Sequence, residues 1–97
     1  METTYCITLN IKTGSGFECF GKFFLGYVKE FAENTFNKLK GSQDVDDKNI
    51  LHLDLMATRH DLPMNMHVIT CTLEDLAENC RIITRETFKL FNLEEKQ

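Results

Sequence analysis

The stretch that decides the fold is Thr72 to Leu93, TLEDLAENCRIITRETFKLFNL. Its apolar and small residues recur at helical spacing, which predicts one amphipathic helix that packs on a core. Asp75 follows Thr72 by three residues, so the two side chains can form a capping box at the start of this helix. The predicted buried stripe is Leu73, Leu76, Ala77, Cys80, Thr84, Thr87, Phe88 and Phe91. A helix of about 22 residues is roughly 33 Å long, which is enough to cross a small sheet.

The N-terminal part of the chain predicts a hairpin. Residues 5–13 alternate between apolar and polar side chains, as a half-buried strand does, and a Gly-Ser-Gly turn follows at 14–16. Residues 17–26 fit either a second strand or the start of a long helix. The strand is favoured because Gly21 and Gly26 would each cost a helix interior about 1 kcal/mol. A three-residue loop would also pair Lys12 with Glu18 across the hairpin.

The next elements repeat this order. Residues 27–40 predict a helix that ends at Gly41, and its expected buried residues are Val28, Phe31, Ala32, Thr35 and Leu39. A polar, acidic loop at 42–48 leads to an alternating strand at 49–59. A turn at 60–63 and a partner strand at 64–71 precede the long helix.

The whole chain therefore reads as strand, strand, helix, twice. We expect one α+β domain over residues 1–97: a two-layer sandwich with a four-stranded antiparallel sheet and both helices on one face. The alternative order is βαββα, with one long first helix. The segments FAEN (31–34) and LAEN (76–79) occupy equivalent places, so the domain can be two ββα halves, 5–41 and 50–93.

Composition narrows the class of protein. The chain has 97 residues, of which 42% are hydrophobic and 27% are charged, as in an ordinary globular domain. A net charge of −4 without a Lys/Arg cluster argues against nucleic acid as a partner. No apolar run is long enough to span a membrane, and the first residues lack the features of a signal peptide. We therefore expect a cytoplasmic protein whose four cysteines are reduced.

The candidate site is the face of the sheet that the helices leave open. If the 60–63 turn pairs Arg59 with Met64, Met56 lies opposite His67 and both point away from the helices. Several large apolar residues would then share a face that normally carries polar side chains, and such a patch indicates a covered surface. The predicted partner-binding residues are Phe20, Phe24, Met56, Ile69 and His67. A second apolar flank is predicted on the last helix at Ile82, Leu90 and Leu93.

Two function classes follow from these patterns. No catalytic constellation or cofactor motif is present, so the first hypothesis is a small, non-enzymatic interaction module that binds a second copy of itself or another protein. The alternative is a metal- or thiol-dependent site centred on His52, His67 and Cys71, with Cys6 as a further candidate ligand. All four residues are predicted to point to the open face of the sheet, but they lack the CxxC or HxxxH spacing of a strong zinc motif. RNA-binding sheets also display aromatic side chains, but the acidic balance of the chain argues against that function.

Overall fold

The computed structural model describes residues 2–44 and 50–93. The acidic segment at 45–48 and the predicted first residue of the third strand, Asn49, lie outside these described residues. The elements are β1 (Thr4–Thr13), β2 (Gly16–Gly26), α1 (Lys29–Asn37), β3 (Leu51–Arg59), β4 (Leu62–Thr70), α2 (Leu73–Phe88) and a π-helical turn (Lys89–Leu93).

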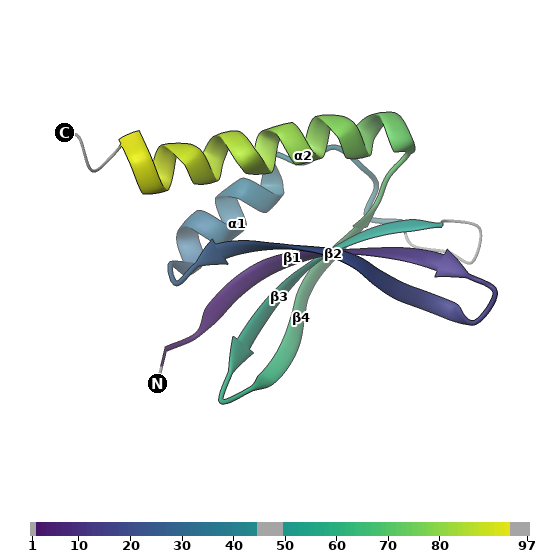
Figure 1. Cartoon of the computed structure of the whole chain (residues 1–97), viewed down its shortest axis with the longest axis horizontal. Helices are drawn as coiled ribbons and strands as arrows, with labels where there is room; N and C mark the ends of the chain where they lie inside the picture. The colour runs from purple at the N-terminus through teal and green to yellow at the C-terminus, as the bar shows by residue number, and fades with distance from the viewer. Residues whose placement is uncertain (1, 45–49, 94–97) are drawn as a thin grey trace.

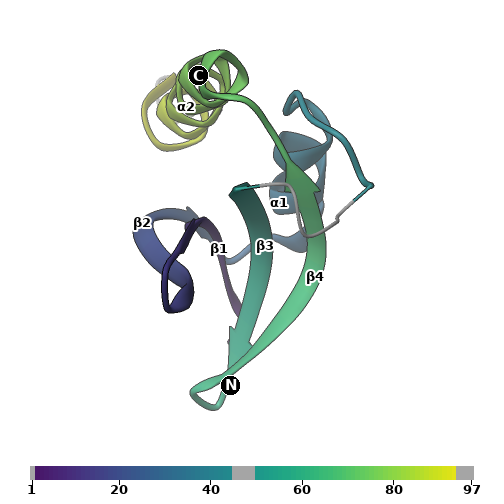
Figure 2. The ribbon, with the colours of Figure 1, turned by 90° about the vertical axis from the view of Figure 1, so that its right-hand side faces the viewer.

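The four strands form one antiparallel sheet in the order β2-β1-β3-β4. Both helices lie on the same side of this sheet, with α2 running along it (Figure 1). Figure 2 shows the strands side by side, with α2 on the side of β2 and α1 on the side of β4. The predicted two-layer α+β fold and the ββαββα order are confirmed, and the βαββα alternative is wrong.

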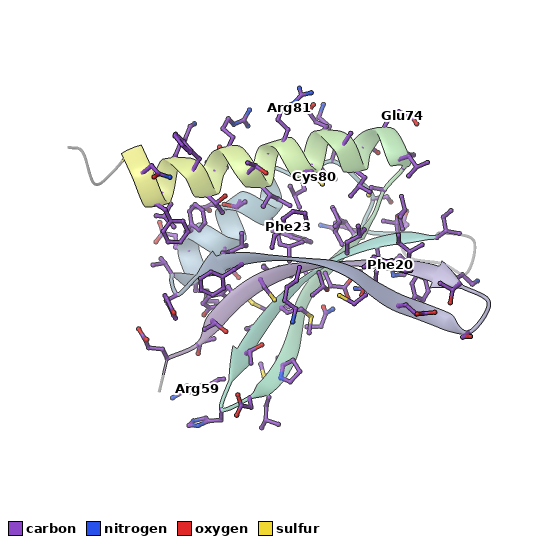
Figure 3. All side chains as sticks on the ribbon, viewed as in Figure 1. Phe20, Phe23, Arg59, Glu74, Cys80 and Arg81 are labelled. Atoms are coloured by element: carbon purple, nitrogen blue, oxygen red, sulfur yellow. The ribbon has the colours of Figure 1, made fainter. Side chains whose placement is uncertain are left out.

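The core lies between the sheet and the helices. Residues from β1, β2, β3 and α1 are fully enclosed there, because their side chains are the apolar half of each alternating or helical pattern. The buried cluster is Tyr5, Ile7, Leu25, Ala32, Phe36, Leu53, Leu55, Ile69 and Ile83. Phe23 rises from β2 toward α2 and packs against this cluster (Figure 3).

Residues 17–26 form strand β2, as the two glycines predicted. The loop before it is shorter than expected, because Thr13 is already paired with Gly16. The predicted pair of Lys12 with Glu18 is therefore wrong: Lys12 lies opposite Phe17. The carboxylate of Glu18 instead accepts a hydrogen bond of 2.7 Å from the hydroxyl of Thr13.

Helix α1 is shorter than predicted. It begins at Lys29, after Val28, whose side chain makes no capping hydrogen bond and is 55% exposed. The expectation that Val28 is buried is wrong, and Phe36, which was not expected in the core, is buried. The chain then brings Gly41 against β4, where Ser42 and Thr70 exchange two backbone hydrogen bonds of 2.8 Å. This bridge ties the end of α1 to the edge of the sheet.

The β3–β4 hairpin differs from the prediction in its turn and in its register. His60 and Asp61 form a two-residue turn with φ of 55° and 64°, so Arg59 pairs with Leu62 instead of Met64. A bulge at Met66 then adds one residue to β4 between the Met56 pair and the Leu55 pair. Because side chains alternate along a strand, one extra residue reverses the face of every residue beyond it.

Helix α2 begins as predicted but presents a different face to the core. The hydroxyl of Thr72 accepts a hydrogen bond of 3.1 Å from the Asp75 N–H, and the Asp75 carboxylate accepts one from the Thr72 N–H, which completes the capping box. The buried residues are Asn79, Ile82, Ile83 and Glu86. Leu73 and Phe88, expected in the core, are 69% and 54% exposed, and Ile82, expected on an outer flank, is buried.

Two buried polar residues explain this rotation of α2. The side-chain amide of Asn79 accepts from the Lys40 N–H at 2.7 Å and donates to the Lys40 carbonyl at 2.8 Å. About two turns further on, the carboxylate of Glu86 lies 3.0 Å from the ammonium group of Lys38. Both partners belong to the segment that leaves α1, so α2 turns its Asn79 and Glu86 side inward and its Glu74 and Arg81 side to solvent (Figure 3).

Candidate functional site

The open face of the sheet is the side away from the helices. The odd-numbered residues of β1 and β3, such as Ile7 and Leu53, lie in the core, so the even-numbered residues of these central strands point to the open face. On β2, Lys22 and Phe24 lie opposite even-numbered residues of β1 and therefore share this face. We take this surface as the candidate functional site.

An apolar row crosses the open face. Phe24 of β2 pairs with Cys6 of β1, and Cys6 pairs in turn with Met56 of β3. The Phe24 ring is 50% exposed and meets the ring of Tyr27 edge-on, with centroids 5.6 Å apart. The sequence correctly placed Phe24 and Met56 on one face, and the register makes them part of a single three-strand row.

A polar row lies directly beside the apolar one. Lys22 of β2 pairs with Thr8, and Thr8 pairs with Asp54 of β3. Asp54 Oδ2 accepts a hydrogen bond of 2.6 Å from the side chain of Asn65 on β4. Asp54 Oδ1 is enclosed and finds no hydrogen-bond partner among the described residues. The row therefore carries a cation at one end and an incompletely satisfied carboxylate at the other.

Phe17 is an open-face residue that the sequence analysis missed. Its ring stacks on the imidazole of His52, with centroids 4.2 Å apart and planes at 28°. The Nε2 atom of His52 is enclosed and lacks a hydrogen-bond partner within residues 2–44 and 50–93. A two-residue loop and a bulge between Leu9 and Asn10 determine which residues at this end of β2 point to the open face. Phe17 was not predicted there because neither feature has a strong signal in the sequence.

Phe20 occupies the bulge itself. Gly21 pairs with Leu9 and Cys19 with Asn10, so Phe20 is the extra residue between a helix-facing and an open-face position. Its side chain is 59% exposed. Because Phe20 has no partner residue on β1 in this register, alternation assigns it to neither face, and its place on the open face stays a prediction.

Two predicted open-face residues lie on the opposite side. The bulge at Met66 turns His67 and Ile69 toward the helices, where His67 pairs with Leu55 and Ile69 with Leu53. Ile69 is buried in the core. The imidazole of His67 stacks on Phe36 at 6.0 Å, and its Nε2 lies 3.9 Å from the carboxylate of Glu33. Their predicted position on the open face is wrong.

The same reversal separates the four candidate metal or thiol residues. Cys6 and His52 lie on the open face, whereas His67 and Cys71 lie on the helix-facing side. Within residues 2–44 and 50–93, no group of three or more His, Cys, Asp or Glu side chains is arranged to hold a metal ion. His52, His67 and Cys71 therefore do not share one face of the sheet, which was the reason for predicting a site there.

The surroundings of Cys6 and Cys71 lower the reactivity of these two thiols. All four cysteines are free thiols. Burial raises the pKa of the Cys6 thiol, and the nearby Lys22 offsets part of this shift. Burial likewise raises the pKa of Cys71, and the carboxylate of Asp75 raises it further. Since the thiolate is the nucleophile, both shifts lower the reactivity of these residues.

Comparisons with known proteins give no further assignment: no protein-family model, no curated protein and no solved structure matches this chain. None of the helices in the described ranges is both long and apolar enough to cross a membrane.

Proposed function

We propose that this chain is a small, non-enzymatic interaction module that forms a homodimer through the open face of its sheet. The observation that carries the proposal is the apolar row Phe24, Cys6 and Met56, which crosses three strands on a face that no helix covers. Water-facing sheet surfaces are normally polar, so a row of this kind indicates a surface that is covered in the functional state.

The adjacent polar row supports a second copy as the covering partner. Lys22 and Asp54 lie on the two strands that flank Thr8, so their backbones are about 9.5 Å apart, which is two strand spacings. A two-fold axis parallel to β1 above Thr8 would place Lys22 of each copy over Asp54 of the other. The same axis would place Phe24 over Met56 twice. The face is therefore complementary to itself, which an isologous dimer requires.

The unpartnered carboxylate oxygen of Asp54 adds to this argument. An enclosed carboxylate oxygen without a hydrogen-bond partner destabilises a fold, and a cation brought close to it offsets that penalty. Asp54 Oδ1 is such an atom. A second copy would bring the Lys22 ammonium group near the Asp54 carboxylate, and the field of this cation would offset part of that penalty without direct contact with the enclosed oxygen.

Sedimentation equilibrium at micromolar to near-millimolar concentration tests this proposal. The wild-type chain is expected to sediment as a dimer, and Phe24→Glu is expected to be a folded monomer because it puts a carboxylate in the apolar row. Leu73→Glu is the matched control, because Leu73 is 69% exposed on α2, away from the open face. A wild-type monomer throughout this range, or a Phe24→Glu dimer as stable as the wild type, would exclude the proposal.

A further inference from the structure

A second apolar surface lies on the opposite side of the sheet, beside the β3–β4 hairpin. The hairpin extends beyond the layer of helices (Figure 1), so the helix-facing side of its outer end has no helix above it. A groove of about 620 Å³ occupies this place. We refer to it as the hairpin groove. Its apolar lining consists of Tyr5, Ala57, Leu62, Met64 and Met66.

The floor of the hairpin groove continues the core. Tyr5 belongs to the buried cluster, and Ala57 and Met66 pack against that cluster. Toward the turn the same apolar surface becomes open to solvent, because Leu62 and Met64 are 69% and 65% exposed. Contiguous apolar surface that runs from a core into solvent indicates a binding site. Methionine side chains are also well suited to a groove that adapts to its ligand, since they are flexible and polarizable.

The charged side chains that line the groove are basic. Lys29 at the start of α1, Arg59 at the end of β3 and His60 in the turn all contribute to the lining. None of the described residues that line the groove is acidic. The whole chain is net negative, with 15 acidic and 11 Lys or Arg residues, whereas the charged residues that line the groove are positive. An anion would therefore be attracted to this groove and repelled by most of the remaining surface.

The size and chemistry of the groove together define a ligand. We propose that the hairpin groove binds an amphiphilic anion, a linear hydrocarbon chain that ends in a carboxylate. The hydrocarbon would cover Met64, Met66 and Tyr5, and the carboxylate would meet the guanidinium of Arg59, which pairs well with carboxylates. A volume of about 620 Å³ is within the range of small-molecule sites.

A peptide strand fits this place less well. β4 is an edge strand, but Pro63 lacks the backbone N–H that strand addition uses, and the bulge at Met66 interrupts the edge. Both features lie beside the groove. A ligand that needs no backbone hydrogen bonds from β4 is therefore favoured over an added strand.

Titration with decanoate, followed by NMR of the methionine methyl groups and by calorimetry, tests the proposal. Decanoate is expected to shift the Met64 and Met66 signals saturably, while 1-decanol, which has the same chain without the charge, binds at least fivefold more weakly. Arg59→Gln is expected to weaken decanoate binding about tenfold, the loss expected from one charge-assisted contact. Arg81→Gln is the control, because Arg81 lies on the far side of α2 (Figure 3) and its effect should be small.

Met64→Asp provides a second variant that keeps the fold, since this side chain is largely exposed. It is expected to abolish decanoate binding without a change in dimerisation, because the groove and the open face lie on opposite sides of the sheet. The proposal is overturned if decanoate gives no saturable shift at millimolar concentration, or if decanol binds equally well. It is also overturned if the Met64 and Met66 signals move with protein concentration alone, which would assign the groove to a second copy.

Discussion

At the scale of single residues, two polar side chains decide how α2 lies on the sheet. Asn79 is fully enclosed and bonds both backbone groups of Lys40, and the Glu86 carboxylate is held by the ammonium group of Lys38. Neither contact is visible in a hydrophobic pattern, which treats both residues as solvent-facing. The helix therefore turns toward specific polar partners, and some of its apolar residues remain exposed as a consequence.

Replacing Asn79 with Ala tests the first contact. The variant loses both hydrogen bonds and leaves the N–H and carbonyl of Lys40 without these partners, so we expect the free energy of unfolding to fall by about 2 kcal/mol. Urea denaturation followed by circular dichroism measures the change. Asn34→Ala, at an exposed position of α1, is the control and should change stability by less than about 0.5 kcal/mol. Equal effects of the two substitutions would show that the contact with Lys40 is unimportant.

The contact of Glu86 predicts a dependence of stability on pH. The hydrogen bond from Lys38 holds the pKa of the Glu86 carboxyl below its ordinary value of 4.5 in the folded chain. A lowered folded pKa stabilises the fold at pH above the ordinary value, and this contribution is lost as pH falls through the folded pKa. Glu86→Gln is therefore expected to be less stable than wild type at pH 7, with a difference that shrinks in acid. Urea denaturation from pH 7 to pH 3 measures it; a difference independent of pH would contradict the assignment.

At the scale of elements, the sequence predicted the order of the strands and helices but not the register of the second hairpin. Alternation identified β3 and β4, and Gly21 and Gly26 correctly favoured a strand over a long helix. The bulge at Met66 has no distinctive local sequence, because any residue can be the extra one on an edge strand. That single residue moved His67 and Ile69 to the other face. The open-face position was predicted correctly at Phe24, where the shorter loop and the bulge at Phe20 offset each other, and at Met56 on β3.

The connection from α1 to β4 gives a test at this scale. A Cβ atom at Gly41 would collide with the backbone carbonyl of Thr70, because the chain passes directly against β4 there. Gly41→Ala is therefore expected to destabilise the fold by about 1–3 kcal/mol. Gly14→Ala is the matched control: nothing lies near its added Cβ atom, and its φ is not positive. Thermal unfolding compares the two variants, and a Gly41→Ala variant as stable as Gly14→Ala would show that this packing does not hold.

At the scale of the whole molecule, the sheet has two surfaces with different chemistry. The open face carries an apolar row beside a row with both signs of charge, which suits a copy of itself. The hairpin groove carries an apolar floor beside Lys29 and Arg59, and none of its described lining residues is acidic, which suits an amphiphilic anion. Asn65 is shared, because it lines the groove and donates to Asp54. The sheet separates the other residues of the two surfaces, so substitutions there on one surface should leave the other unaffected. The two proposals can therefore fail independently.

The most direct test of the central proposal is a charge exchange across the open face, measured by sedimentation equilibrium. In the proposed dimer Lys22 of each copy faces Asp54 of the other, so Lys22→Glu or Asp54→Lys alone places like charges together twice and should weaken dimerisation at least tenfold. The double variant restores opposite charges and should recover most of the wild-type affinity, provided circular dichroism shows all variants folded. Additive loss in the double variant would contradict the proposed two-fold arrangement, and a wild-type chain that remains monomeric would contradict self-association itself.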